Sequence, residues 1–346
     1  MIVTSRRQLL GAFGALLVMA PNRPVRAMKP YKPPESLLEA ARKEGELNLY
    51  SATFPEMQQD VIKLFNQRFP FVRVNYVRAS GGQMFTRVRS EAASGKLDAD
   101  VIEHSDRGQS KSIEHLFADY APPNAADYLP ETLVSPKLWP TQTTAWSIAW
   151  NSELVKNPPA SWMDLCKPEY GGGKIGQVIA ASGGTTWTRI MFERLVLGED
   201  YWTRQAATQP KLFPSGAPLS DSVVRGEVLI APILSSVVFP KQKDGAPIDG
   251  IFPPEGVPII PFGSGLAMTA RHPAAGRLWL DWVLSDEGQI QSLRDQANMT
   301  ALRVPPIDLV HFNPSKHRVW TPDFTAFQTL HDSWQEEWNK IYGYRQ

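Results

Sequence analysis

The chain of 346 residues is long enough for two domains of ordinary size or for one large domain. Hydrophobic residues make up 42% and charged residues 21%, a globular balance that excludes a disordered or membrane-embedded chain. The 36 basic and 35 acidic residues show no basic excess of the kind that nucleic-acid binding requires, so we expect no nucleic-acid partner.

Residues 1–27 predict an export signal. Arg6 and Arg7 precede an apolar run at 11–20, and Val25-Arg26-Ala27 supplies a small residue at a cleavage site. The paired arginines indicate the twin-arginine route and therefore a periplasmic protein. The apolar run is far shorter than the ~20 residues of a membrane span, so we expect no stable membrane insertion after cleavage. The alternative is a membrane-anchoring helix.

Removal of this segment also changes the charge of the chain. It holds four arginines and no acidic residue, so the basic count falls to 32 against 35 acidic residues, a net charge of −3. The single cysteine, Cys166, excludes an internal disulfide and a cysteine-cluster metal site. We interpret Cys166 as a core residue.

Hydrophobic periodicity predicts strands and helices in alternation from residue 35 onward. The expected strands are 46–51, 72–77, 99–103, 146–151, 175–180 and 228–233, with strand-like segments at 257–260 and 265–269. The expected helices are 35–43, 53–69, 81–93, 162–165, 187–197, 201–207, 219–225, 273–284 and 325–342, and 120–140 is expected to be a surface connection. This order predicts an α/β fold with a largely parallel, doubly wound sheet, followed by a second α/β unit.

Ligands of such sheets bind beyond the carboxyl ends of the strands. Here these ends carry 51–53, 79–82 and 104–106, which are rich in serine and glycine. The first turn has no G-x-G-x-x-G and the chain has no Walker lysine motif, which argues against a nucleotide ligand.

A turn rich in small and hydroxylated residues, 182–187, separates an apolar run from a segment with helical spacing. A second turn of this kind, 214–218, follows about thirty residues later. The first amides of a helix lack internal partners and lie at the positive end of its dipole, so such turns suit an anionic group. The alternative is an ordinary helix cap with glycine in a tight turn.

Several segments together resemble the extracellular solute-binding proteins of ABC importers, in the branch that is similar to ferric-iron-binding proteins. The segments that carry this resemblance are Ala99-Asp100-Val101, the run 150–155 (WNSELV), Pro214-Ser215-Gly216 with 224–228 (VRGEV), 254–258 (PEGVP), His272-Pro273-Ala274-Ala275 and 284–289 (LSDEGQ). They span most of the chain after the export signal.

The resemblance implies a type II periplasmic-binding-protein fold, with two lobes joined by crossing strands and a hinged, ligand-binding cleft between them. We expect one lobe from 28–140 plus about 255–300, and the other from 141–254 plus about 301–346. It further implies a small-molecule ligand, a membrane permease and a separate ATPase as partners. We expect a monomer with no cofactor, no catalytic residue and no metal ligand.

The chain departs from the family's iron-binding members at one informative place. These members carry an adjacent tyrosine pair soon after the strand that corresponds to 228–233, and no tyrosine lies near this strand here. Many members also carry an arginine where Thr144 or Trp146 falls, so charge recognition would move to Arg78, Arg107 or Arg189. We interpret His104 as a structural hydrogen bonder.

The candidate site therefore combines hydroxyls, glycine amides and aromatic walls. We expect the ligand to contact Ser51, Ser80, Gly81, Asp106, Thr144, Trp146, Ser182, Gly183, Gly184, Thr185, Thr186, Ser215, Gly216, Ser235 and Ser236. Trp187 and Phe262 are further candidates for aromatic walls. This chemistry suits a small polar or anionic solute, and organophosphates, phosphonates and carboxylates all remain open.

Three alternatives remain. A ferric-iron carrier would need other hard oxygen ligands in place of the missing tyrosines. A secreted enzyme would be expected to show a nucleophile motif, and neither G-x-S-x-G nor H-E-x-x-H occurs. A sensory binder that presents its ligand to a receptor is not distinguished from a transport protein by sequence.

Overall fold

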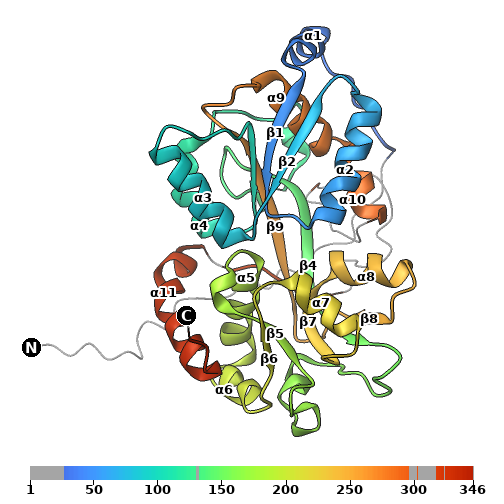
Figure 1. The fold of residues 1–346 in the computed structure, drawn as a ribbon, viewed down its shortest axis with the longest axis vertical. Helices are drawn as coiled ribbons and strands as arrows, with labels where there is room; N and C mark the ends of the chain where they lie inside the picture. Colours follow the sequence, from blue (N-terminus) through green and yellow to red (C-terminus); the bar gives the residue numbers. More distant parts are fainter. Residues whose placement is uncertain (1–26, 130–131, 296–301, 303–316, 323, 346) are drawn as a thin grey trace, which may run out of the picture.

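A computed structural model describes residues 27–129, 132–295, 302, 317–322 and 324–345. The described chain forms two lobes, one above the other in Figure 1, and two long strands run through both. The 1–27 export segment lies almost wholly outside the described residues. No helix among the described residues is long and apolar enough to cross a membrane.

Lobe I is built on parallel strands. Strands β1 (Glu46–Ser51), β2 (Arg73–Arg78) and β3 (Val101–His104) pair in the order β2-β1-β3, all parallel. Helices α1 (Glu35–Glu44), α2 (Pro55–Arg68), α3 (Gly81–Ala93), α4 (Arg107–Ser112), α9 (Pro273–Leu284) and α10 (Asp286–Asp295) surround them (Figure 1). The expected βαβαβ order is confirmed.

Side-chain alternation along these strands builds a core on each face of the sheet. Leu49 and Val101 enter a cluster with Phe65 of α2, whereas their neighbours Tyr50 and Ile102 enter another with α3. Successive residues of a strand point to opposite faces, so one sheet buries both clusters.

Two antiparallel strands connect the lobes. Strand β4 (Trp139–Asn151) pairs with β9 (Val257–Leu266), from Trp139 opposite Ser264 to Ala145 opposite Ile259. At one end β9 pairs with β3 of lobe I, and at the other end β4 pairs with β7 (Ile230–Leu234) of lobe II. These are the crossing strands that the resemblance implies.

Both crossing strands are longer than expected. Strand β4 begins at Trp139, inside the expected surface connection, and β9 replaces two expected short strands. The run Phe262-Gly263-Ser264-Gly265 suggests a tight turn, but it stays extended because the sheet is packed closely around it. A Cβ on Gly265 would lie 2.6 Å from the Phe117 ring.

Lobe II holds the second α/β unit. Its helices are α5 (Thr185–Phe192), α6 (Tyr201–Ala206), α7 (Gly216–Val224), α8 (Ser235–Lys243) and α11 (Phe324–Tyr342), and its further strands are β5 (Gly176–Val178), β6 (Lys211–Phe213), β8 (Ile248–Ile251) and β10 (Val319–Trp320). Short 3₁₀ helices of lobe II lie at Trp162–Cys166, Pro168–Tyr170 and Ala180–Ser182, and a π-helical turn, Glu193–Leu197, extends α5. Two further 3₁₀ helices, Glu114–Leu116 and Ala125–Asp127, belong to lobe I. Cys166 is half-buried against this core, and burial raises the pKa of its thiol to about 11.

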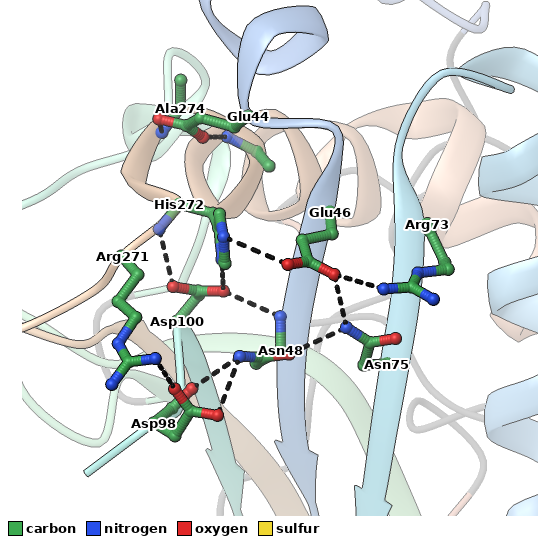
Figure 2. A network of polar contacts seen from close by, with 11 residues as sticks. Glu44, Glu46, Asn48, Arg73, Asn75, Asp98, Asp100, Arg271, His272 and Ala274 are labelled. Atoms are coloured by element: carbon green, nitrogen blue, oxygen red, sulfur yellow. Dashed lines mark hydrogen bonds and ion pairs between the residues drawn. The ribbon is translucent and has the colours of Figure 1, made fainter. Parts of the chain in front are cut away.

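A polar network ties the amino-terminal ends of the lobe I strands to α9 (Figure 2). The buried Asp100 carboxylate accepts from the amides of Asn48 and His272, each at 2.8 Å, and contacts the His272 ring at 2.8 Å. Glu44 accepts from the first amides of α9. The Ala99-Asp100-Val101 and His272-Pro273 segments are thus direct partners across 172 residues of sequence.

Replacement of Asp100 by alanine should destabilise the chain by about 2–4 kcal/mol, because it leaves two backbone amides and an imidazole without their buried acceptor. Urea unfolding followed by circular dichroism measures this change. The matched control is Arg271→Ala, which removes only the exposed ion pair with Asp98 and should cost less than about 1 kcal/mol. Equal effects of the two substitutions would contradict a structural role for the network.

Candidate functional site

A cleft lies between the lobes at the carboxyl ends of the lobe I strands. It holds about 600 Å³ of space not filled by atoms, part of it open to solvent. The lining residues come from both lobes: Ala52, Phe54, Arg78, Ser80, Gly81 and Ser105 from lobe I, Trp146 and Phe262 from the crossing strands, and Val178, Ser182, Gly183, Gly184, Thr185, Thr186, Ser215, Gly216, Pro232, Ile233, Leu234 and Val237 from lobe II.

Four helices begin at this cleft. They are α3 at Gly81, α5 at Thr185, α7 at Gly216 and α8 at Ser235, and the residue before each start lines the cleft. The first amides of each helix have no partner within the helix and carry its positive dipole end. The site therefore concentrates hydrogen-bond donors and positive potential in one place.

The α5 turn is built so that only glycine fits. Gly183 and Gly184 have φ of +66° and +57°, which L side chains rarely adopt. A Cβ on Gly184 would also lie 2.8 Å from Ser105 Oγ of lobe I. Because these two residues have no side chain, the turn can approach lobe I closely. Closure of the cleft requires such a close approach.

The two lobes touch beside the cleft. A Cβ on Gly81 of lobe I would lie 3.1 Å from the Cα of Gly184 in lobe II. A Cβ on Gly216 of lobe II would lie 3.2 Å from the Phe54 ring of lobe I. The described arrangement is thus a closed one, in which the Gly81 backbone lies against the Gly184 backbone and the Phe54 ring lies against the Gly216 backbone.

His104 holds the α3 terminus in position. Its Nδ1 accepts from the Asp106 amide at 3.1 Å, so its Nε2 carries the proton and donates to the Gly81 carbonyl at 2.7 Å. The ring is buried, and both nitrogens are used within lobe I. This agrees with the interpretation of His104 as a structural hydrogen bonder.

Arg78 is the arginine that reaches the cleft. It ends β2, its side chain is exposed, and no ion pair to it occurs within the described part of the chain. Arg189, by contrast, is buried against Glu193, with its guanidinium 5.4 Å from the Trp146 ring centroid. Arg107 donates to the Leu133 carbonyl, and burial lowers its pKa to about 9.

Most of the expected site residues line this cleft. Those that do are Ser80, Gly81, Trp146, Ser182, Gly183, Gly184, Thr185, Thr186, Ser215 and Gly216, together with Phe262. Trp187 does not line it, because its side chain is buried against α11. The Trp146 indole donates to the Thr185 carbonyl at 3.0 Å and so presents its ring to the cleft.

The structure does not bring Ser51 and Asp106 to the cleft surface. The Ser51 hydroxyl donates to buried Glu103 at 2.6 Å. Asp106 is buried and caps α4 by accepting from the Gln109 amide at 2.9 Å. Burial raises the pKa of the Asp106 carboxyl, while His104 and the amides of Gln109 and Gly184 act in the opposite direction.

Thr144, Ser235 and Ser236 likewise lie beneath the cleft wall. The Thr144 hydroxyl donates to Ser236 at 2.9 Å, and both are buried. Their neighbours Leu234 and Val237 line the cleft instead, because α8 begins at Ser235 and turns the serines inward. The sequence therefore indicated the correct turn, at the start of α8. The directions of its side chains depend on the residue at which that helix begins.

Phe54 and Ser105 are lining residues that the sequence argument did not select. Ser105 lies within the expected strand end 104–106, and Phe54 follows the expected strand end 51–53 by one residue. The position at a strand end was therefore the signal that could have identified both. Among the described residues, no group of three His, Cys, Asp or Glu side chains is placed to hold a metal ion.

The chain belongs to the family of bacterial extracellular solute-binding proteins, whose model matches residues 50–290. It is 22% identical over 328 residues to an uncharacterised protein of Haemophilus influenzae, covering 86% of this chain and 92% of that protein. Members of this family are the solute-binding components of ABC transporters, with a small-molecule ligand and a permease partner.

Solved structures share the fold. The periplasmic binding protein AfuA from Actinobacillus pleuropneumoniae, with exogenous fructose-6-phosphate bound, superposes with a TM-score of 0.74 at 21% identity, over 87% of this chain and all of that one. The substrate-binding protein of an ABC transporter from Agrobacterium tumefaciens gives 0.78 at 15%, over 87% and 96%. Iron-bound HitA from Pseudomonas aeruginosa gives 0.67 at 18%, over 85% and 99%. The fold is that of the type II periplasmic binding proteins, as expected.

Substitution of Gly81 by alanine should hinder closure, since the new methyl group meets the Gly184 backbone across the lobe interface. We expect the radius of gyration of this variant to exceed that of the parent chain, measured by small-angle X-ray scattering. Gly82→Ala is the control, because its Cβ would make only ordinary contacts at 3.6 Å or more. Identical scattering from both variants and the parent chain would show that the glycine contact does not limit closure.

Proposed function

We propose that this protein captures a small organic anion between its lobes in the periplasm and delivers it to the permease of an ABC importer. The observation that carries the proposal is the convergence of four helix N-termini and the exposed Arg78 on one cleft. Backbone amides at helix ends and a guanidinium are the groups that bind phosphate and carboxylate in proteins.

The family and the neighbouring structures support this reading at the level of class. AfuA holds a sugar phosphate, and its fold is shared over most of this chain. HitA holds iron, but the lining residues described here include no tyrosine, histidine or carboxylate. Ferric iron requires hard anionic oxygen ligands, so we do not propose a metal as the solute. The proposed protein has no catalytic residue, and it captures and releases its solute chemically unchanged.

Arg78→Met should weaken binding of organic phosphates about 10- to 100-fold, since it removes the one charged donor described at the cleft. The stability of the free protein should change by less than about 1 kcal/mol because the side chain is exposed. Isothermal titration calorimetry with a panel of organic phosphates measures the affinities. Arg89→Met, an exposed arginine of α3 outside the cleft lining, is the control and should bind like the parent. Equal affinities for both variants would exclude Arg78 from the site.

We also propose export by the twin-arginine route, supported by the Arg6-Arg7 pair before an apolar run. Replacement of both arginines by lysine keeps the charge and should abolish accumulation in the periplasmic fraction, measured by immunoblot after spheroplasting. A control that replaces Arg23 and Arg26 by lysine should be exported normally. Unchanged export of the first variant would rule out this route.

A further inference from the structure

The cleft lining contains two adjoining sets of groups with different chemistry. One set, called the polar wall, consists of the N-termini of α3, α5 and α7 with Arg78. The other, called the apolar wall, consists of six apolar side chains, of which Leu234 and Val237 flank the start of α8: Phe54, Trp146, Ile233, Leu234, Val237 and Phe262. All of these except Phe54 are at least nine-tenths buried in the closed arrangement, so a solute that reaches this wall leaves water for an apolar environment.

The second feature is the supply of hydrogen-bond acceptors. Among the described residues that line the cleft, none is Asp, Glu, Asn, Gln or His. The Ser80 hydroxyl already donates to Gln83 Oε1 at 2.9 Å. The other side-chain hydroxyls of the lining belong to Ser105, Ser182, Thr185, Thr186 and Ser215. The Trp146 indole N–H is already bonded to the Thr185 carbonyl. An ammonium group or a row of sugar hydroxyls would therefore find few partners at the apolar wall.

Building on the function proposed above, we propose that the solute is an anion with an apolar body. It carries a phosphonate- or phosphate-type head on a short aromatic or alkyl group, with neither an ammonium group nor several hydroxyls. The head lies against the helix N-termini and Arg78, and the body lies against the apolar wall. This differs from the polyhydroxylated solute that AfuA holds.

The physical reason is the asymmetry of hydrogen bonding in a closed cleft. Each solute hydroxyl buried without a partner weakens binding by about tenfold or more, and an unpaired ammonium weakens it further. An apolar body loses nothing there and gains from burial against aromatic rings. The apolar wall thus selects among anions that the polar wall alone would accept.

Thermal-shift assays and calorimetry with matched probes test this proposal. We expect phenylphosphonate to raise the melting temperature and to bind at least tenfold more tightly than 2-aminoethylphosphonate, fructose-6-phosphate or inorganic phosphate. Benzoate distinguishes the head group, and it should bind more weakly than phenylphosphonate. Tighter binding of fructose-6-phosphate or 2-aminoethylphosphonate would overturn the proposal and leave the function proposed above intact. Failure of every anion to bind would overturn both.

A substitution in the apolar wall gives an independent test. Val237 lies in the first turn of α8, where an acidic residue is compatible with the helix. Val237→Asp should lower the affinity for phenylphosphonate and raise that for 2-aminoethylphosphonate, so that their ratio shifts at least tenfold. Val237→Leu is the apolar control and should keep the parent preference. If Val237→Asp does not fold, Val237→Asn supplies an uncharged acceptor. An unchanged ratio in a folded variant would contradict the proposal.

Discussion

The pairing of β4 with β9 is the constraint on which the rest of the structure depends. These two strands run through both lobes, and each lobe builds its sheet outward from them, lobe I through β3 and lobe II through β7. Because the strands are hydrogen-bonded to each other along the crossing, the lobes can rotate about them but cannot separate. The cleft is therefore a consequence of two sheets that share a two-stranded connection.

The polar wall of the cleft follows from this topology. In parallel α/β units each helix begins where a strand has just ended, so helix N-termini gather at one edge of a sheet. Here α3 of lobe I faces α5 and α7 of lobe II, and Gly81 meets Gly184 at the point of closest approach. Small residues at these turns serve two purposes: they expose backbone amides, and they let the two lobes come into contact.

The opposite end of the lobe I sheet has a structural role. There Asp100 accepts from two backbone amides and contacts the His272 ring, and Glu44 accepts from the first amides of α9, which anchors α9 to the strands (Figure 2). Between the two ends, buried Glu103 accepts from the hydroxyls of Ser51 and Thr53. Serines at strand ends thus stabilise the scaffold in one place, as Ser51 does, and line the cleft in others, as Ser80 and Ser105 do.

The sequence by itself determined the order of strands and helices, the serine- and glycine-rich turns and the resemblance to a family, because hydrophobic periodicity and turn residues act locally. Ten of the fifteen residues that are expected to contact the solute line the cleft, and most of them lie in the turns at 80–81, 182–186 and 215–216. Only the tertiary structure decided which side chains reach that cleft. The hydroxyls of Ser51, Thr144 and Ser236 are buried and hydrogen-bonded within the protein, whereas Phe54, Arg78 and Val237 line the cleft. The direction of a side chain at the end of an element depends on helix starts and strand registers that long-range packing sets.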